Sequence, residues 1–222
     1  MAYLIGTDEA GYGPNLGPLV VAASVWRVPD TLVGADLYDV LGAGVARPAA
    51  DDGVKGRVLM GDSKALYQSH GTLANLERGV LSGLTLLERP FATWRDVWLA
   101  LDGNGTDAFD GEPCLADFEM AVPVNAKRRE LRGGVSRLRR TLKKSSVELV
   151  DLRAVAVLPG RFNELVASAG NKGTALSQIT LRLLDRVMAP LDAGPIDVIC
   201  DKHGGRNHYG PLLQQQFPEW LV

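Results

Sequence analysis

Two short apolar segments near the N-terminus flank a turn that is rich in glycine and proline. Residues 3–8 and 18–27 have the length and composition of strands, and residues 11–18 hold three glycines and two prolines. Ala22, Ala23 and Val25 continue the second apolar segment. The pattern predicts two strands joined as a hairpin at the centre of a sheet.

The first apolar segment ends in two adjacent acids, Asp8 and Glu9. Neighbouring residues on a regular strand point to opposite faces, so both acids can line one site only if the backbone turns after Asp8. A turn that begins at Ala10 would let Glu9 bend around, and the backbone N–H groups of Gly11 and Gly13 could then meet a phosphate or a sugar. An isolated Asp-Glu pair would indicate solvated acids on a hairpin. The glycine-rich turn between two strands favours a site.

The rest of the chain alternates between strand and helix patterns, which predicts an α/β fold. Residues 29–58 are predicted to be an irregular connection. We expect strands over 93–101, 155–158 and 196–201. We expect helices over 62–84, 127–144, 173–191 and 209–216, with Asp62 or Ser63 capping the first and Asn171 the third.

The charge is distributed unevenly along a chain whose net charge is only −2. Residues 127–144 contain nine lysines and arginines against one acid, Glu130, while Leu131, Val135, Leu138 and Leu142 recur at helical spacing. The segment is therefore either a clamp for nucleic acid or a solvated amphipathic helix. We favour the clamp, because so many cations would create a strong local positive field.

Composition narrows the class of protein further. A length of 222 residues suits one domain with a sizeable core, and 46% hydrophobic residues with 23% charged residues is ordinary for a globular chain. The acids at 8 and 9 stand where a secretory signal would be apolar, and no apolar run approaches the ~18 residues of a membrane span. We expect a cytoplasmic monomer without a membrane partner.

Cys114 and Cys200 lack metal-ligand spacing, and Cys200 is expected to be buried.

Residues 5–23 resemble the signature of the type 2 ribonucleases H, the ribonuclease HII/HIII family. In that family a strand ends in Asp-Glu-Ala-Gly-Arg-Gly-Pro and the chain continues with Gly-Pro-Val-Val-Ala-Ala. Residues 61–66, Gly-Asp-Ser-Lys-Ala-Leu, are similar to the segment that opens the family's next helix. The resemblance implies a ribonuclease H-like mixed sheet flanked by helices. It also implies a single domain over 1–222, with an insertion at 85–150 that includes the basic helix.

The family requires a third carboxylate at the end of another strand, and Asp102 and Asp201 are the candidates. Asp102 stands in an Asp-Gly-Asn sequence that is similar to the family's own. The family places a helix before that strand, however, and residues 85–95 leave no room for one. Asp201 has the expected order, since it follows a helix over 173–191 and a strand over 196–201. We therefore favour Asp201.

The resemblance implies that Asp8, Glu9 and Asp201 are catalytic and hold two Mg²⁺ or Mn²⁺ ions roughly 4 Å apart. Such hard cations take oxygen ligands, which carboxylates supply. The family's fourth carboxylate should open a later helix rich in alanine and serine. Glu219 is the only later acid and its context does not match. We therefore expect the natural chain to continue after Val222.

Substrate contacts are expected from three segments. The family's Gly-Arg-Gly is Gly-Tyr-Gly here, and its glycine amides would read the 2′-hydroxyl of RNA. The turn after Asp201 is crowded with polar side chains that suit a nucleic-acid backbone, a solvated loop being the alternative. The expected substrate-binding residues are Gly11, Tyr12, Gly13, Lys64, Lys202, His203, Arg206 and Asn207.

The expected function is metal-dependent hydrolysis of the RNA strand of an RNA–DNA hybrid by a two-metal endonuclease mechanism. Two alternatives stay open. The chain could be a non-catalytic nucleic-acid-binding relative, as the missing fourth acid suggests, or a structure-selective DNA nuclease on the same fold.

Overall fold

The computed structural model describes residues 1–11, 17–48, 56–68, 71–102, 109, 112–113 and 115–219. The chain is α/β, with a mixed sheet of parallel and antiparallel strands flanked by helices. It divides into two compact units, each described here by itself. The first unit comprises Met1–Ala2 and Trp26–Val150, and the second comprises Tyr3–Val25 and Asp151–Val222.

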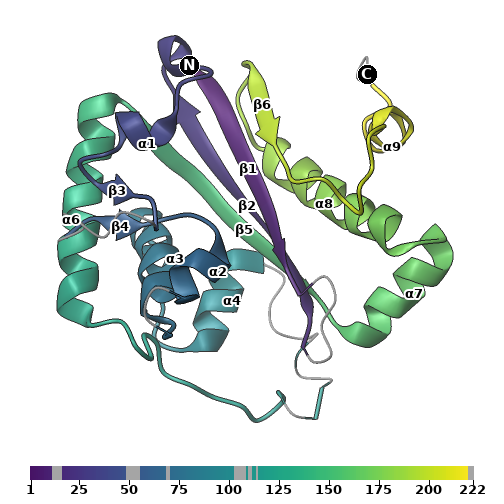
Figure 1. Ribbon diagram of the computed structural model, residues 1–222, viewed down its shortest axis with the longest axis horizontal. Coiled ribbons are helices and arrows are strands. Elements are labelled where there is room, and N and C mark those ends of the chain that lie inside the picture. Colours follow the sequence, from purple (N-terminus) through teal and green to yellow (C-terminus); the bar gives the residue numbers. More distant parts are fainter. Residues whose placement is uncertain are drawn as a thin grey trace. The chain divides into compact units, whose positions relative to one another are not determined.

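The second unit holds most of a four-stranded sheet with the order β5-β2-β1-β6. Its strands are β1 (Ala2–Ala10), β2 (Leu19–Val28), β5 (Glu148–Val157) and β6 (Ile196–Ile199). The two N-terminal strands occupy the centre of the sheet, which confirms that prediction (Figure 1). β5 is longer than the strand predicted over 155–158 and contains the first three of those residues.

Alternation along β2 explains how this sheet builds a core. Leu19, Val21, Ala23 and Val25 are buried, and the residues between them are only partly covered. A period of two places these four side chains on one face of the sheet. On β1 the burial is continuous instead, from Ala2 to Ile5, as is typical of a strand covered on both faces.

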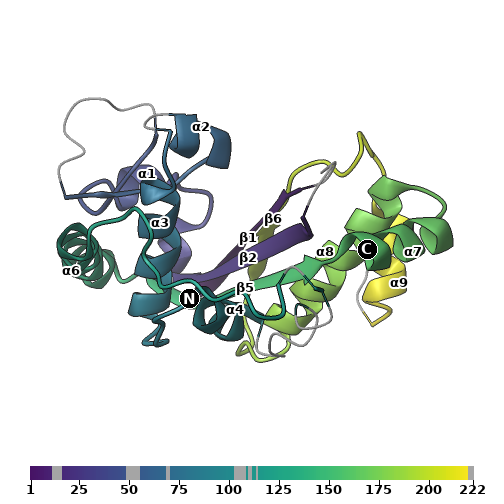
Figure 2. The same ribbon diagram turned by 90° about the horizontal axis from the view of Figure 1, so that it is seen from below.

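Three helices complete the second unit: α7 (Pro159–Ala169), α8 (Lys172–Met188) and α9 (Gly210–Gln216). α8 runs alongside the sheet (Figures 1 and 2), and its start is fixed by Asn171, whose side chain accepts a hydrogen bond from the backbone N–H of Thr174. This confirms the predicted cap. α7 was not predicted, although Pro159 in its first turn and Gly170 at its C-terminus, with φ +82°, are typical helix limits.

The first unit is mostly helical. A short parallel pair, β3 (Val45–Ala46) and β4 (Val58–Leu59), lies among its helices. α3 packs against both α6 and β4, and the two helices lie side by side in Figures 1 and 2. The helices are η1 (Asp30–Leu32), α1 (Leu37–Val40), α2 (Ser63–Gln68), α3 (Ala74–Leu86), α4 (Trp94–Asp102) and α6 (Arg128–Ser145).

α6 confirms the amphipathic helix predicted over 127–144. Leu131, Val135, Leu138 and Leu142 are all buried. The two glycines at 133 and 134 do not interrupt the helix, since Gly134 lies on its buried side, where an added Cβ would come within 3.2 Å of Val58.

The helix predicted over 62–84 is two helices, α2 and α3. The Asp62 carboxylate accepts hydrogen bonds from the backbone N–H groups of Lys64 and Ala65, which confirms it as the cap of α2. Gly71, between the helices, has φ +61°, a left-handed conformation that a continuous helix excludes.

The strand predicted over 93–101 is wrong, because this segment forms α4. Asp96 accepts hydrogen bonds from the backbone N–H groups of Ala92 and Thr93, and Thr93 Oγ1 accepts one from the N–H of Asp96. This reciprocal pair is the capping box that starts a helix. The apolar run Val97–Leu101 is typical of a strand and outweighs the capping box when the sequence alone is considered.

The expected burial of Cys200 is also wrong. β6 is an edge strand that pairs only with β1, in parallel, and Cys200 directly after it is exposed. Val198 and Ile199 are 40% and 68% exposed. An apolar run predicts a buried strand only when neighbours cover both of its faces.

Among the described residues, no helix combines the length and hydrophobicity that crossing a bilayer requires.

Candidate functional site

The acid pair lies within β1 rather than beyond it. The strand continues through Asp8 and Glu9 to Ala10, so Asp8 does not end it and Glu9 does not bend around as predicted. Asp8 is exposed, and its carboxylate accepts a hydrogen bond from the backbone N–H of Glu9 at 2.8 Å. Glu9 is partly buried. The neighbouring carboxylates therefore have different surroundings, as the alternation of a strand requires.

Asp201 reaches this pair through the register of the sheet. β6 pairs with β1 in parallel, with Tyr3 opposite Ile196 and Gly6 opposite Ile199. If the same register is continued for two residues, it sets Asp201 opposite Asp8. The carboxyl ends of parallel strands share one edge of a sheet, so the two acids belong to the same edge.

Glu9 experiences the negative charges of both Asp8 and Asp201. Burial raises the pKa of the Glu9 carboxyl above its ordinary value of 4.5, and the negative charges of Asp8 and Asp201 raise it further. Repulsion from two neighbouring carboxylates disfavours a third charge. A bound cation would relieve that repulsion, and carboxylate oxygens are the ligands that Mg²⁺ and Mn²⁺ prefer.

The donor set thus suits a hard divalent cation in charge and in atom type. Over the described residues, no three histidine, cysteine, aspartate or glutamate side chains are gathered closely enough to hold one metal ion. Asp8 directs one oxygen to the Glu9 backbone. Metal binding would therefore require the carboxylates to turn toward a common point.

Asp102, the competing candidate, ends helix α4 in the first unit instead of a strand. Asp8, Glu9 and Asp201 all belong to the second unit. The structure therefore supplies an electrostatic link between Asp201 and Glu9 of the acid pair. Asp201 is also the candidate that the sequence favours.

His203 fastens the turn after Asp201 to helix α8. Its side chain is buried, and Nδ1 lies 3.0 Å from Oγ of Ser177. The Ser177 hydroxyl donates its single hydrogen to the carbonyl oxygen of Gly173 at 2.9 Å, so it accepts one from His203 Nδ1–H. This hydrogen bond therefore places a proton on Nδ1 of His203.

The surroundings of His203 disfavour its charged form. Burial lowers the pKa of His203 below its ordinary value of 6.5, and the Arg206 cation lowers it further, while Asp201 acts in the opposite direction. The backbone N–H of His203 also donates to the Tyr209 hydroxyl at 2.8 Å. In this arrangement the histidine holds the turn in place, and a direct contact with substrate stays a prediction.

The other polar residues of the turn are less buried than His203. Arg206 donates to Oγ1 of Thr174 at 2.6 Å, and its buried Nε has no acceptor within the part of the chain that the structure describes. The exposed Lys202 donates to Oδ1 of Asn207 at 2.7 Å. A hollow of about 530 Å³ opens beside them, lined by Asn171, Lys172, Gly173, His203, Gly204, Gly205 and Arg206.

A second cavity of about 480 Å³ lies next to Asp201 and is mostly apolar. α8 contributes Leu181 and Leu184, and Leu213 and Phe217 come from α9 and the residue after it. Asp201, Lys202 and His203 form its polar side. Sequence reasoning missed this cavity and the partners Thr174, Ser177 and Tyr209, because each contact joins residues that no local pattern connects.

The remaining predicted residues fall in different places. Gly11 directly follows β1 with φ +82°, and a Cβ there would lie 2.5 Å from the carbonyl oxygen of Pro18, so this position requires glycine. Tyr12 and Gly13 lie outside the described residues. Lys64 is exposed on α2 in the first unit, so the geometry of this cluster assigns it no role.

Searches of protein-family models, of curated proteins and of solved structures find no match to this chain.

Proposed function

We propose that the chain is a metal-dependent endonuclease that hydrolyses the RNA strand of an RNA–DNA hybrid. The observation that carries the proposal is that the charges of Asp8 and Asp201 both raise the pKa of Glu9 at one edge of the sheet. Repelling carboxylates at an exposed edge cost stability, and such arrangements are typical of sites that bind cations. The resemblance of residues 5–23 to the type 2 ribonucleases H supports the choice of substrate.

Each group of the cluster has a proposed part in the reaction. Asp8, Glu9 and Asp201 would hold Mg²⁺ or Mn²⁺, which when bound supplies Lewis-acid stabilisation of the reacting phosphate and lowers the pKa of an attacking water. Lys202 and Arg206 carry positive charge in the turn that follows Asp201 and would hold the phosphate backbone of the substrate. His203 positions this turn through Ser177.

Cleavage of an end-labelled RNA–DNA hybrid by the full chain tests the proposal. We expect cutting with Mg²⁺ or Mn²⁺ and none with EDTA. Asp8→Asn, Glu9→Gln and Asp201→Asn should each lower the rate at least a hundredfold. Asp197→Asn is the matched control, because this exposed acid on β6 has no effect on Glu9 and should leave the rate unchanged.

The same assay separates the alternatives. Equal cutting by wild type and Asp8→Asn, or no cutting by wild type, would contradict the nuclease proposal. Binding of the hybrid without cutting would favour a non-catalytic nucleic-acid-binding relative. Equal cutting of a duplex with DNA in place of the RNA strand would indicate a DNA nuclease.

Metal binding can be measured without activity. A ligand that binds only the folded protein stabilises it by RT ln(1 + [L]/Kd), or about 1.4 kcal/mol at tenfold excess over Kd. We expect Mg²⁺ or Mn²⁺ to raise the melting temperature of wild type and of Asp197→Asn, and not that of Asp8→Asn or Asp201→Asn. A rise common to all four proteins would place the ion elsewhere.

A further inference from the structure

Helix α6 presents cations along its whole exposed side. Of its 18 residues, eight are lysine or arginine and one, Glu130, is acidic. The apolar residues are buried on the opposite side. Eighteen residues of α-helix span about 27 Å. The exposed cations of this band are Arg128, Arg129, Arg132, Arg137, Arg139, Arg140, Lys143 and Lys144.

Three cations of the band have no acidic partner among the described residues. Glu130 lies 4.0 Å from Arg78 and 3.7 Å from Lys127, near the start of the helix. Within the described ranges, no acidic side chain forms an ion pair with Arg132, Arg140 or Lys143. The charges of these three side chains therefore remain available to an external anion.

The spacing of the band destabilises the helix by itself. Arg128 and Arg132 are four residues apart, as are Arg139 and Lys143, and Arg140 and Lys144. Like charges at this spacing repel and cost about 0.2–0.5 kcal/mol per pair. A merely solvated face gains nothing from this arrangement, whereas a polyanion bound along the helix would turn the repulsion into attraction.

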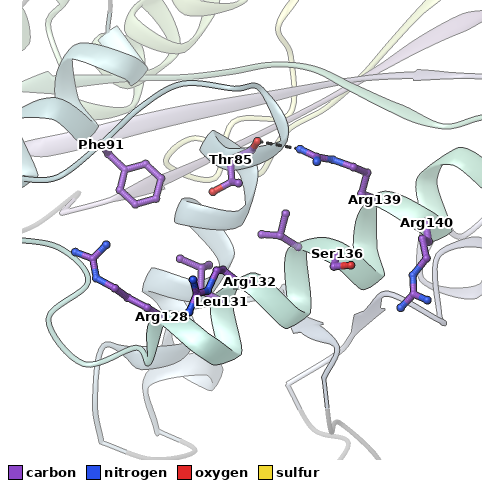
Figure 3. A pocket seen from close by; sticks show the side chains of 9 residues that line it. Thr85, Phe91, Arg128, Leu131, Arg132, Ser136, Arg139 and Arg140 are labelled. Atoms are coloured by element: carbon purple, nitrogen blue, oxygen red, sulfur yellow. Dashed lines mark hydrogen bonds between the residues drawn. The ribbon is translucent and has the colours of Figure 1, made fainter.

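A hollow of about 520 Å³ lies beside the band within the first unit, and its lining is both apolar and cationic. Phe91, Leu131 and Val135 form the apolar part. In Figure 3, Phe91 and Arg128 lie at one end, and Arg139 and Arg140 at the other. Arg132 and Ser136 of α6 and Thr85 of α3 complete the lining.

The guanidinium groups at this hollow keep donors free. Arg139 makes one long hydrogen bond, of 3.5 Å, to the carbonyl oxygen of Thr85, and Arg128 makes one of 3.2 Å to that of Val122 (Figure 3). A guanidinium has five N–H donors in a fork that matches phosphate oxygens. Both arginines can therefore bind phosphate without losing these contacts.

Cations also line the other flank of α6. A hollow of about 720 Å³ there includes Arg57, Arg137, Arg140 and Lys144. Arg140 lines both hollows. The buried Nε of Arg57 has no hydrogen-bond acceptor among the residues that the structure describes. Positive charge thus lies on both flanks of α6. A nucleic-acid strand that crosses the helix could contact cations on either side.

We infer that the band and the hollow with Phe91 bind a single-stranded segment of nucleic acid. Its phosphates would lie on the cations of α6, and a base would lie against Phe91 and the apolar lining. A single strand offers phosphates and exposed base faces together. A duplex offers mainly phosphates at its surface and would leave the apolar part of the hollow unused. This inference does not rest on the proposed nuclease activity.

Binding of fluorescein-labelled oligo(dT) and oligo(U), each of 15 nucleotides, to the full chain tests the inference by fluorescence anisotropy. EDTA in the buffer removes any contribution from the metal site. The triple variant Arg132→Gln/Arg140→Gln/Lys143→Gln should weaken binding at least tenfold. Its slope of log K against log[salt] should be shallower by about 2, because each phosphate contact to a single strand contributes about 0.7.

Two further variants separate charge from stacking. Phe91→Leu should weaken binding about fivefold to a hundredfold with an unchanged salt slope, as loss of one stacked base predicts. Arg132→Lys/Arg140→Lys keeps the charge and should keep the slope. The matched control Arg161→Gln/Arg182→Gln/Arg186→Gln removes equal charge from α7 and α8 and should bind as wild type does.

Three results would overturn the inference. One is equal weakening by the control and by the α6 triple variant, which would show unspecific attraction. The second is wild-type binding by Phe91→Leu together with equal affinity for a 15-base-pair duplex. The third is displacement of the oligonucleotide by polyglutamate at the same charge concentration, which would indicate an acidic protein partner. Unfolding curves of each variant show that it is folded.

Discussion

The negative charge of Asp201, two residues beyond the end of β6, acts on Glu9 of β1, and continuing the parallel pairing of Gly6 with Ile199 by two residues sets Asp201 opposite Asp8. They are far apart in the sequence and come together only through the sheet. Both charges raise the pKa of Glu9. The relationship links the acid pair of the N-terminal motif electrostatically to a third carboxylate.

Removal of the Asp201 charge should lower the pKa of Glu9 toward its ordinary value of 4.5, because that charge disfavours ionisation of Glu9. Carbon-13 NMR titration of the glutamate side chains in wild type and Asp201→Asn measures the change. Asp197→Asn removes the same charge from β6 and should leave the Glu9 titration in place. An identical titration curve for Glu9 in wild type and Asp201→Asn would refute the coupling.

The raised pKa of Glu9 should also appear in the stability of the protein. Between pH 4.5 and the raised pKa, the folded protein binds more protons at Glu9 than the unfolded chain does, so this group makes stability fall as pH rises. Glu9→Gln removes the penalty. We expect this variant to unfold at higher urea concentration than wild type at pH 7, and the difference to shrink below pH 4.5. A less stable variant at pH 7 would count against the repulsion.

The buried hydrogen bond between Ser177 and His203 should be important for stability. Ser177→Ala leaves Nδ1–H of the buried imidazole without its acceptor, which costs about 1–3 kcal/mol. Ser82→Ala is the matched control, since this helical serine is fully buried and its Oγ has no partner among the described residues. We expect Ser82→Ala to be neutral or stabilising in urea unfolding. Similar losses for the two variants would argue against the hydrogen bond.

The lowered pKa of His203 predicts a loss of stability in mild acid. Below pH 6.5 the unfolded chain takes up a proton at this residue before the folded protein does, so the free energy of unfolding falls as pH falls toward the folded pKa. One such group contributes at most about 1.4 kcal/mol per pH unit. Urea unfolding at pH 5 to 7.5 measures the slope.

Two histidine variants identify the source of that slope. His203→Gln should lack this contribution, whereas His208→Gln, which alters an exposed histidine of the same turn, should keep it. Equal slopes in wild type and His203→Gln would assign the pH dependence to other groups.

Gly11 should tolerate substitution less well than Gly17. Both have positive φ, +82° and +88°, so alanine costs about 1 kcal/mol at either position. At Gly11 the added Cβ would also lie 2.5 Å from the Pro18 carbonyl oxygen, while at Gly17 nothing lies within 4 Å. We expect Gly11→Ala to be the more destabilising by at least 1 kcal/mol in urea unfolding. Equal losses of stability for the two variants would show that the Cβ added at Gly11 does not clash with the Pro18 carbonyl oxygen.

Local signals made several elements predictable from the sequence. The apolar segments beside the glycine-rich turn predicted β1 and β2, and the caps Asp62 and Asn171 predicted where α2 and α8 begin. The apolar spacing of α6 predicted its buried side. All of these depend on residues within a few positions of one another, where periodicity and hydrogen bonding to the nearest backbone decide the conformation.

The wrong predictions concern segments whose local sequence is compatible with two different structures. The segment ending at Leu101 is apolar enough for a strand, and the reciprocal hydrogen bonds of Thr93 and Asp96 make it a helix. Cys200 follows an apolar run, and its exposure depends on which strands pair with β6. Neighbours in space determine the exposure of Cys200, whereas the capping residues of α4 are a local signal that the apolar run outweighed.

The sequence by itself determined the acid pair, the strands that carry it and the cationic side of α6, because each depends on short-range order along the chain. Only the tertiary structure decided that Asp201 acts on Glu9, that Ser177 holds His203, and that Phe91 lies beside the arginines of α6. Those contacts depend on sheet register and helix packing, which bring together residues that are distant in sequence and leave no periodic trace there.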